Sequence, residues 1–232
     1  MDAKIESALN LLREAAALAP AAFSTSFGAE DMVLLDLIRS HRLPIGIFTL
    51  DTGRLPAETH NLMQRVQEVY GDCFSTFFPD ADALQKLVAA DGANGFYRSI
   101  DARKRCCGVR KVEPLSRALA GKAAWVSGLR SDQSAERAAV AARAFDEPYR
   151  LEKFNPLHDW SQAQVWEVIR ARNIPYNELH DRFYPSIGCA PCTRAISVGE
   201  DPRAGRWWWE SGQTRECGLH ARPAVIALRE IA

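Results

Sequence analysis

Residues 21–40 read AAFSTSFGAEDMVLLDLIRS. The apolar start predicts a buried strand over residues 21–27, followed by a turn at Gly28 and a helix from about residue 30 to residue 40. A strand that leads directly into a helix is typical of a parallel sheet. Ser24, Ser26 and the backbone at the helix start suit a bound phosphate or sulfate, but serine and glycine are also ordinary helix caps.

The same alternation continues along the chain and predicts a parallel sheet with helices on both faces. The other expected strands cover residues 45–50, 74–78 and 123–127. The expected helices cover residues 4–19, 56–70, 80–90 and 115–120, and an alanine-rich helix is expected near 138–144. Five prolines interrupt the C-terminal third: Pro175, Pro185, Pro191, Pro202 and Pro223.

Composition narrows the class of protein. The 232 residues suffice for one α/β domain, expected over residues 1–210, with a flexible segment over 211–232. Because 29 basic and 29 acidic residues cancel, no bulk positive field favours nucleic acid. The sequence has neither a signal peptide nor a run of 18 apolar residues, so we expect a cytoplasmic protein that does not enter membranes. Six cysteines in that compartment indicate metal binding or catalysis.

Two cysteine pairs form the most specific pattern. Cys106 and Cys107 are adjacent, and Cys189 and Cys192 form a Cys-x-x-Cys loop. Four thiolates can complete the ligand shell of zinc or of an iron–sulfur cluster, and the spacing leaves both open. Adjacent cysteines on a helix point about 100° apart, so one of the first pair could also be idle.

Polar residues follow the expected strands at the edge where parallel sheets bind ligands. Asp51 to Arg54 follow the strand at 45–50, with a simple turn as the alternative interpretation. Gly128, Arg130 and Arg137 follow the strand at 123–127 in the same way. Arg203 and Arg206, three residues apart, would share one face of a helical turn beside Trp207.

The remaining two cysteines differ from each other. Cys217 lies in a polar segment between Glu216 and Gly218, which predicts an exposed thiol that is either functional or idle. Cys73 precedes phenylalanine-rich sequence, so we interpret it as a core residue.

The motifs together resemble the phosphoadenylyl/adenylyl-sulfate reductases, and within them the assimilatory adenylyl-sulfate reductases. The resemblance is carried by Cys106-Cys107 with Lys111, by Cys189-x-x-Cys192 and by the sequence ECGLH around Cys217. It implies an adenine-nucleotide alpha-hydrolase-like (ATP pyrophosphatase) fold. It also implies a 4Fe–4S cluster on the four paired cysteines, and Cys217 as the nucleophile. The implied substrate-binding residues are Ser24, Ser26, Gly28, Asp51, Arg54, Lys111, Gly128, Arg137, Arg203, Arg206 and Trp207.

The implied reaction is reduction of adenylyl sulfate to sulfite and AMP through an S-sulfocysteine, with thioredoxin or a similar dithiol protein as reductant. The reaction is a step of sulfate assimilation and cysteine biosynthesis. The resemblance also allows a homo-oligomer. Reduction of the 3′-phosphorylated substrate, or of both substrates, stays open. A ligase or thiolating enzyme of the ATP-pyrophosphatase type should retain Ser-Gly-Gly-x-Asp-Ser, which is missing here. A zinc-stabilised binding module would leave Cys217 and the Arg203/Arg206 pair unexplained.

Overall fold

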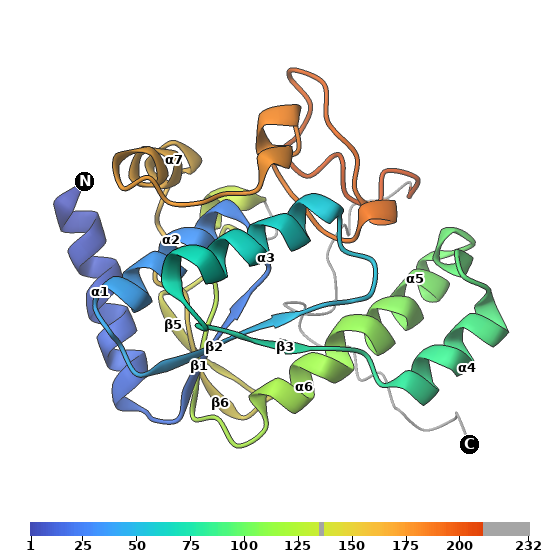
Figure 1. Cartoon of the computed structure of the whole chain (residues 1–232), viewed down its shortest axis with the longest axis horizontal. Coiled ribbons are helices and arrows are strands. Elements are labelled where there is room, and N and C mark those ends of the chain that lie inside the picture. Colours follow the sequence, from blue (N-terminus) through green and yellow to red (C-terminus); the bar gives the residue numbers. More distant parts are fainter. Residues whose placement is uncertain (135–136, 211–232) are drawn as a thin grey trace.

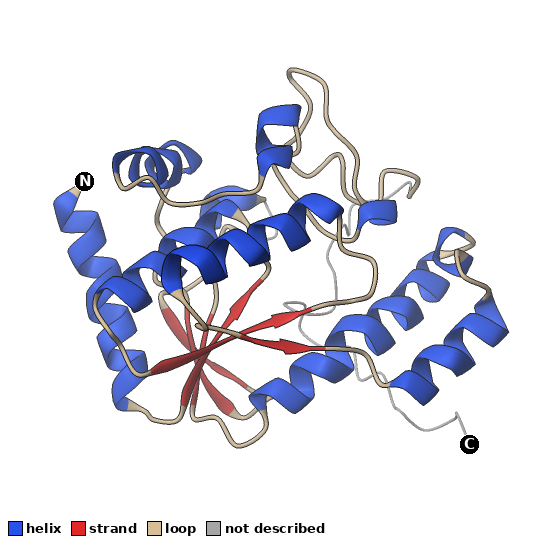
Figure 2. Ribbon diagram, viewed as in Figure 1, coloured by secondary structure: helices blue, strands red, loops and turns tan. Residues whose placement is uncertain are grey.

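A computed structural model describes residues 1–134 and 137–210 of the chain. Figure 1 shows one twisted sheet with helices packed around it, and Figure 2 separates the two kinds of element by colour. The strands are β1 (Ala21–Thr25), β2 (Ile45–Leu50), β3 (Ser75–Phe77), β4 (Ala124–Val126), β5 (Arg143–Asp146) and β6 (Leu151–Phe154). The α-helices are α1 (Asp2–Ala17), α2 (Ala29–Ser40), α3 (Ala57–Tyr70), α4 (Ala81–Asp91), α5 (Ile100–Cys107), α6 (Glu113–Leu119) and α7 (Gln162–Ala171).

The sheet has the strand order β3-β2-β1-β4-β6-β5. All neighbouring strands are parallel except β5 and β6, which form an antiparallel pair at one edge. The predicted α/β class, a parallel sheet flanked by helices, is therefore confirmed. Because β1, β2 and β4 are central and parallel, their carboxyl ends open onto one edge of the sheet, where ligands bind in such folds.

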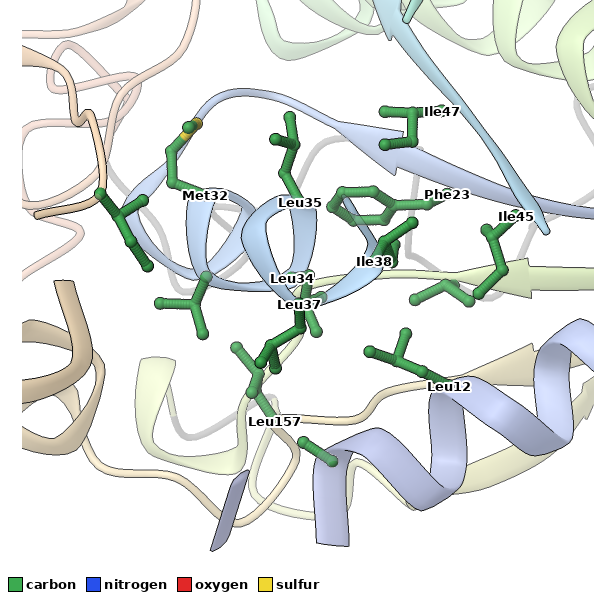
Figure 3. Close-up of a cluster of buried hydrophobic side chains, with 14 of the residues drawn as sticks. Leu12, Phe23, Met32, Leu34, Leu35, Leu37, Ile38, Ile45, Ile47 and Leu157 are labelled. Atoms are coloured by element: carbon green, nitrogen blue, oxygen red, sulfur yellow. The ribbon is translucent and has the colours of Figure 1, made fainter. Parts of the chain in front are cut away.

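Successive residues of each central strand point to opposite faces of the sheet. Phe23 and Ile47 pack in the larger core with α1, α2, α3 and α7, as Figure 3 shows in part. Ala22, Phe48 and Trp125 point the other way and pack with α6. Helices thus cover both faces of the sheet. For this reason the central strands are apolar on both sides and do not alternate between apolar and polar residues.

Helix α2 is buried over nine of its 12 residues, including two acids. Its residue Asp36 accepts hydrogen bonds from Tyr70 Oη at 3.0 Å and from Arg172 Nε at 2.7 Å. These partners come from the end of α3 and from the residue after α7. The carboxylate therefore joins three helices on one face while its buried charge is compensated.

Several expectations about local structure are wrong. The alanine-rich stretch near 138–144 is not a helix, because Arg143–Asp146 pairs with β6 as a strand. That strand pair and α7 were not predicted, and β3 is shorter than expected.

Cys73 is half-buried against the larger core, as its apolar neighbours indicated. Among the helices of the described residues, none has both the length and the apolar character that a membrane span needs.

Leu34→Ala should test the packing of α2 against the sheet. Leu34 is fully buried, so its truncation should lower the free energy of unfolding by about 2–5 kcal/mol, measured by urea titration. Val69 on α3 is 61% exposed, and Val69→Ala should change it by less than about 0.5 kcal/mol. Equal losses in the two variants would contradict this core.

Candidate active site

A pocket of about 230 Å³ opens at the carboxyl ends of β1, β2 and β4. Its walls are the turn after β1, the turn after β4, and two segments from the C-terminal third. Nine of the expected substrate-binding residues line it: Ser24, Ser26, Gly28, Lys111, Gly128, Arg137, Arg203, Arg206 and Trp207. The pocket therefore lies where a parallel sheet binds its ligand.

The turn after β1 is held by its own polar contacts. Ser26 donates from its backbone N and from Oγ to Asp31 Oδ2, at 2.6 and 2.8 Å. Ser24 Oγ accepts a hydrogen bond from Trp125 Nε1 at 2.8 Å. Burial raises the pKa of Asp31 to about 6, assisted by the charge of Glu30 and opposed by the hydrogen bonds from Ser26. Ser26 thus meets a carboxyl group in the pocket wall, whereas Ser24 contacts an indole.

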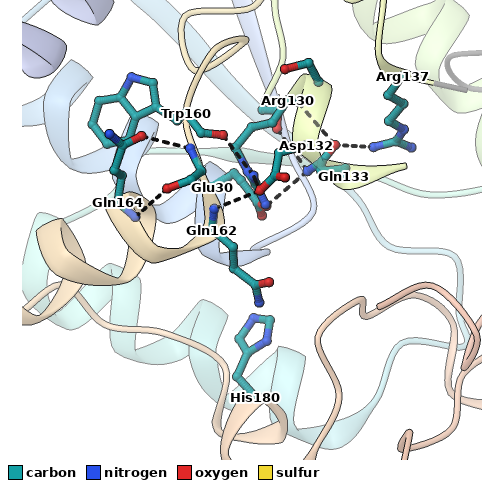
Figure 4. A network of polar contacts seen from close by, with 12 residues as sticks. Glu30, Arg130, Asp132, Gln133, Arg137, Trp160, Gln162, Gln164 and His180 are labelled. Atoms are coloured by element: carbon teal, nitrogen blue, oxygen red, sulfur yellow. Dashed lines mark hydrogen bonds and ion pairs between the residues drawn. The ribbon is translucent and has the colours of Figure 1, made fainter. Parts of the chain in front are cut away.

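Glu30 is the centre of a second polar network, shown in Figure 4. Arg130 donates from Nε and Nη2 to Glu30 Oε1 at 2.9 and 2.8 Å, and Gln133 donates to the same oxygen at 3.0 Å. Burial opposes ionisation of Glu30, but the charge of Arg130 and the hydrogen bonds from the backbone, Gln133 and Arg130 together outweigh it, so the pKa of Glu30 lies below its ordinary value. Arg130 is therefore committed to Glu30, while Arg137 contacts Gln133 at the far end of the network.

The sequence did not identify Glu30 and Asp31 as pocket residues. Acids in the first turn of a helix are ordinary, because they are stabilised by the helix dipole. Only the packing of the loop after β4 against α2 shows that both line the pocket. A Cβ atom on Gly128 would lie 2.2 Å from Asp31 Oδ1, so this contact requires glycine.

The pocket is also lined by Arg203, Arg206 and Trp207. These residues lie in a non-helical turn, so the prediction of a helical turn is wrong. Arg206 N donates to Arg203 O at 2.9 Å. The Arg206 guanidinium is buried over the Trp207 ring, 4.8 Å from its centroid, and Nη1 donates to Ser186 Oγ at 3.3 Å. Its Nε has no partner within the described part of the chain, so a buried donor stays available there.

The two cysteine pairs meet beside this pocket. Cys106 and Cys107 end α5, and Cys189 and Cys192 flank a short turn of the C-terminal third. All four line one cavity of about 20 Å³. Within residues 1–134 and 137–210, no three His, Cys, Asp or Glu side chains are placed to hold one metal ion. A four-iron cluster instead offers each thiolate a separate iron, and four sulfurs around one cavity suit that donor pattern.

Cationic side chains surround the cysteines, with Arg54, Arg103, Arg110 and Lys111 lining the same cavity. Burial alone would raise the pKa of Cys189, but the charge of Lys111 and a 3.2 Å contact with Thr52 Oγ1 lower it below its ordinary value. Burial and the neighbouring Cys189 raise the pKa of Cys192 to about 12. The surroundings therefore favour the thiolate at Cys189 and the neutral thiol at Cys192.

Two predicted substrate contacts do not line the pocket. Asp51 closes its own turn, since Oδ1 accepts from Gly53 N at 2.8 Å and Oδ2 lies 2.9 Å from His60 Nε2. Arg54 lines the cysteine cavity and lies over the Phe96 ring. By contrast, Lys111 and Trp207 line both the pocket and the cysteine cavity. Cys217 lies outside the described residues.

The fold and the pocket define an α/β protein with a serine- and arginine-lined pocket at the carboxyl edge of a parallel sheet. The chain belongs to the phosphoadenosine phosphosulfate reductase family, whose domain model matches residues 20–195. A phosphoadenylyl-sulfate reductase from Candida auris, solved as a phosphate complex, aligns with a TM-score of 0.69 and 28% identity over 79% of this chain and 88% of that one.

Curated relatives are more similar in sequence. An adenosine 5′-phosphosulfate reductase from Allochromatium vinosum is 60% identical over 86% of this chain and 78% of its own length. Its counterpart from Burkholderia cepacia is 54% identical over 85% and 79%. A Candida glabrata FMN adenylyltransferase shares the fold, with a TM-score of 0.54 at 16% identity over 89% of this chain and 73% of that one.

Gly188→Ala should displace Arg206. The added Cβ would lie 2.3 Å from Arg206 Nη2, so the guanidinium must move and AMP should bind about tenfold more weakly in calorimetric titration. Gly46 offers a control because a Cβ there meets nothing closer than 3.7 Å. Unchanged AMP affinity in Gly188→Ala would show that Arg206 does not contact the nucleotide.

Asp31→Asn should change the pH dependence of stability. The unfolded carboxyl ionises near pH 4 and the folded one near pH 6, so the parent loses up to about 3 kcal/mol between these values as pH rises. Asparagine does not titrate. The variant should therefore gain stability relative to the parent across this range in urea titrations. If the difference in unfolding free energy between variant and parent stayed constant from pH 4 to pH 7, the raised pKa of Asp31 would be contradicted.

Proposed function

We propose that this chain is an assimilatory adenylyl-sulfate reductase that releases sulfite and AMP. The observation that supports it best is the shared wall of the anion pocket and the cysteine cavity, made by Lys111 and Trp207. The names of the relatives at 60% and 54% identity agree with this activity. The pocket supplies serine hydroxyls and arginines for a phosphosulfate, and the domain expected over residues 1–210 would bind it.

Cys217 is the proposed nucleophile, in the separate segment expected over residues 211–232. Its thiolate attacks the sulfur of adenylyl sulfate, an S–S bond forms, and the S–O bond to AMP breaks with AMP leaving. A thiolate of reduced thioredoxin then attacks the Cys217 sulfur and expels sulfite. The second thiol of that partner resolves the mixed disulfide, so the dithiol supplies both electrons and Cys217 returns as a thiol.

The pocket residues would each act on the substrate's charge. Arg203, Arg206 and Arg137 would donate to the phosphate and sulfate oxygens, because guanidinium groups bind such oxygens through paired hydrogen bonds. Lys111 would lie between these anions and the cysteine cavity. Trp207 is buried and lines both spaces, so its ring would separate them.

The proposed cofactor is a 4Fe–4S cluster held by Cys106, Cys107, Cys189 and Cys192. It would supply structural stability and contribute to the electrostatics near the substrate, since the thiols already provide both electrons. Arg110 and Lys111 would compensate the thiolates around it. Location in the cytoplasm, thioredoxin as the donor and a homo-oligomeric state belong to the same proposal. A preference for adenylyl sulfate over its 3′-phosphorylated form is part of it as well.

The proposed activity is tested by an anaerobic assay of both sulfonucleotides with reduced thioredoxin, with sulfite as the readout. Adenylyl sulfate should yield sulfite and AMP in equal amounts, because each turnover breaks one S–O bond. The 3′-phosphorylated substrate should react more slowly. Sulfite from neither substrate would refute the proposal, and faster reaction of the 3′-phosphorylated form would reverse its specificity.

Without thioredoxin, the enzyme should stop after the first step. Intact-mass measurement should show one added sulfonate of about 80 Da on the Cys217 peptide, because the thiol is the nucleophile. Cys217→Ser should bind AMP but form no adduct, while Cys73→Ser should react like the parent. Sulfite production by Cys217→Ser at the parent rate would exclude this mechanism.

A further inference from the structure

A group of exposed apolar side chains lies next to the cysteine cavity. Tyr97 and Ile100 are each 40% exposed and Trp208 is 48% exposed. Trp209 joins them, since its ring lies 4.4 Å from that of Tyr97 and 5.8 Å from that of Trp208 between centroids. In Figure 1 the last described residues lie beside the connection from α4 to α5. We name Tyr97, Ile100 and Trp208 the arm surface.

The arm surface has a rigid base. Tyr97 Oη donates to Pro191 O at 2.8 Å, within the Cys-x-x-Cys loop. Its ring also packs against Phe96, with centroids 4.4 Å apart, and Phe96 is buried among the cysteines. An exposed apolar group on a fixed base loses little side-chain entropy when a partner covers it, which is typical of the anchors of protein interfaces.

The described chain ends at a fixed point of the same region. Arg103 on α5 donates to Glu210 from Nε at 2.6 Å and from Nη2 at 3.1 Å. The two side chains are only 2% and 7% exposed. A buried ion pair gains little stability over apolar packing but holds its partners in one geometry. Glu210 is thereby held against the helix that carries Cys106 and Cys107.

This fixed point limits where Cys217 can go. Cys217 follows Glu210 by seven residues, and seven residues span at most about 25 Å even when fully extended. A protein that attacks the Cys217 sulfur must therefore place its own thiolate within that distance of Glu210. Trp208 lies within this range because it precedes Glu210 by two residues. Tyr97 does so because its ring packs on that of Trp209, and Ile100 because it lies about one helical turn before Arg103, the partner of Glu210.

We propose that the arm surface is the docking site of the dithiol protein that reduces the Cys217 adduct. This inference rests on the proposed function. Exposed tryptophan, tyrosine and isoleucine side chains suit the apolar core of a protein interface. The surface around the dithiol of a thioredoxin-type protein would cover these side chains. Cys217, seven residues after Glu210, could then reach the attacking thiolate.

The test separates docking from chemistry in Trp208→Ala and Ile100→Ser, with thioredoxin as the probe. Adduct formation is measured by mass without reductant, and sulfite release is measured with thioredoxin and, separately, with dithiothreitol. The KM for thioredoxin should rise about tenfold or more in Trp208→Ala, because interface tryptophans carry much of the binding free energy. Ile100→Ser should raise it in the same direction. Adduct formation and release by dithiothreitol should stay within about twofold of the parent, because neither needs docking.

Phe183→Ala is the matched control, because Phe183 is 63% exposed on another segment. Its KM for thioredoxin should equal that of the parent. An unchanged KM in both arm-surface variants would overturn the proposal. Slower adduct formation in these variants would also overturn it, because the surface would then bind the chain's own C-terminal segment. Loss of an oligomer at unchanged KM would overturn it as well, because the surface would then bind a second copy of the chain. Failure of the parent to form any Cys217 adduct would instead refute the proposed function itself.

Discussion

Four thiols from two distant segments must meet at one small cavity, and much of this molecule is arranged around that requirement. One pair ends α5, and the other lies at a single 3-10 turn, Ala190–Cys192, within an otherwise irregular segment. Their mutual repulsion as thiolates would oppose folding unless positive charge compensates it. Lys111, Arg54 and Arg110 supply such charge, and Lys111 also faces the anion pocket. Lys111 can therefore stabilise both cysteine thiolates and an anionic substrate.

The central sheet was predictable because its physical signals are local. The apolar runs that form β1, β2 and β4 are bounded by turn residues, and each leads to polar residues at the edge where ligands bind. The strand pair β5–β6 was not predictable in this way. Arg143–Asp146 lies at an edge and is largely exposed, so its pairing depends on β6 rather than on its own sequence.

The site shows the same division between local and tertiary information. Cysteine spacing indicated the two pairs, and most residues expected at the pocket do line it. The acids Glu30 and Asp31 were not assigned to the site, because their place in the pocket depends on how the loop after β4 packs. Arg54 was expected at the substrate but lines the cysteine cavity, since the turn after β2 lies between the two spaces. Spacing in sequence could not distinguish these neighbours.

The most direct measurement of the central claim is the Mössbauer spectrum of protein reconstituted anaerobically with iron-57, recorded with and without AMP. The account predicts about four irons per chain, in the spectrum of a cubane cluster. It also predicts that AMP shifts the spectrum, because Lys111 and Trp207 line both spaces. Stoichiometric zinc with no bound iron, or a cluster spectrum unchanged at saturating AMP, would contradict the coupling of cysteine cavity and pocket.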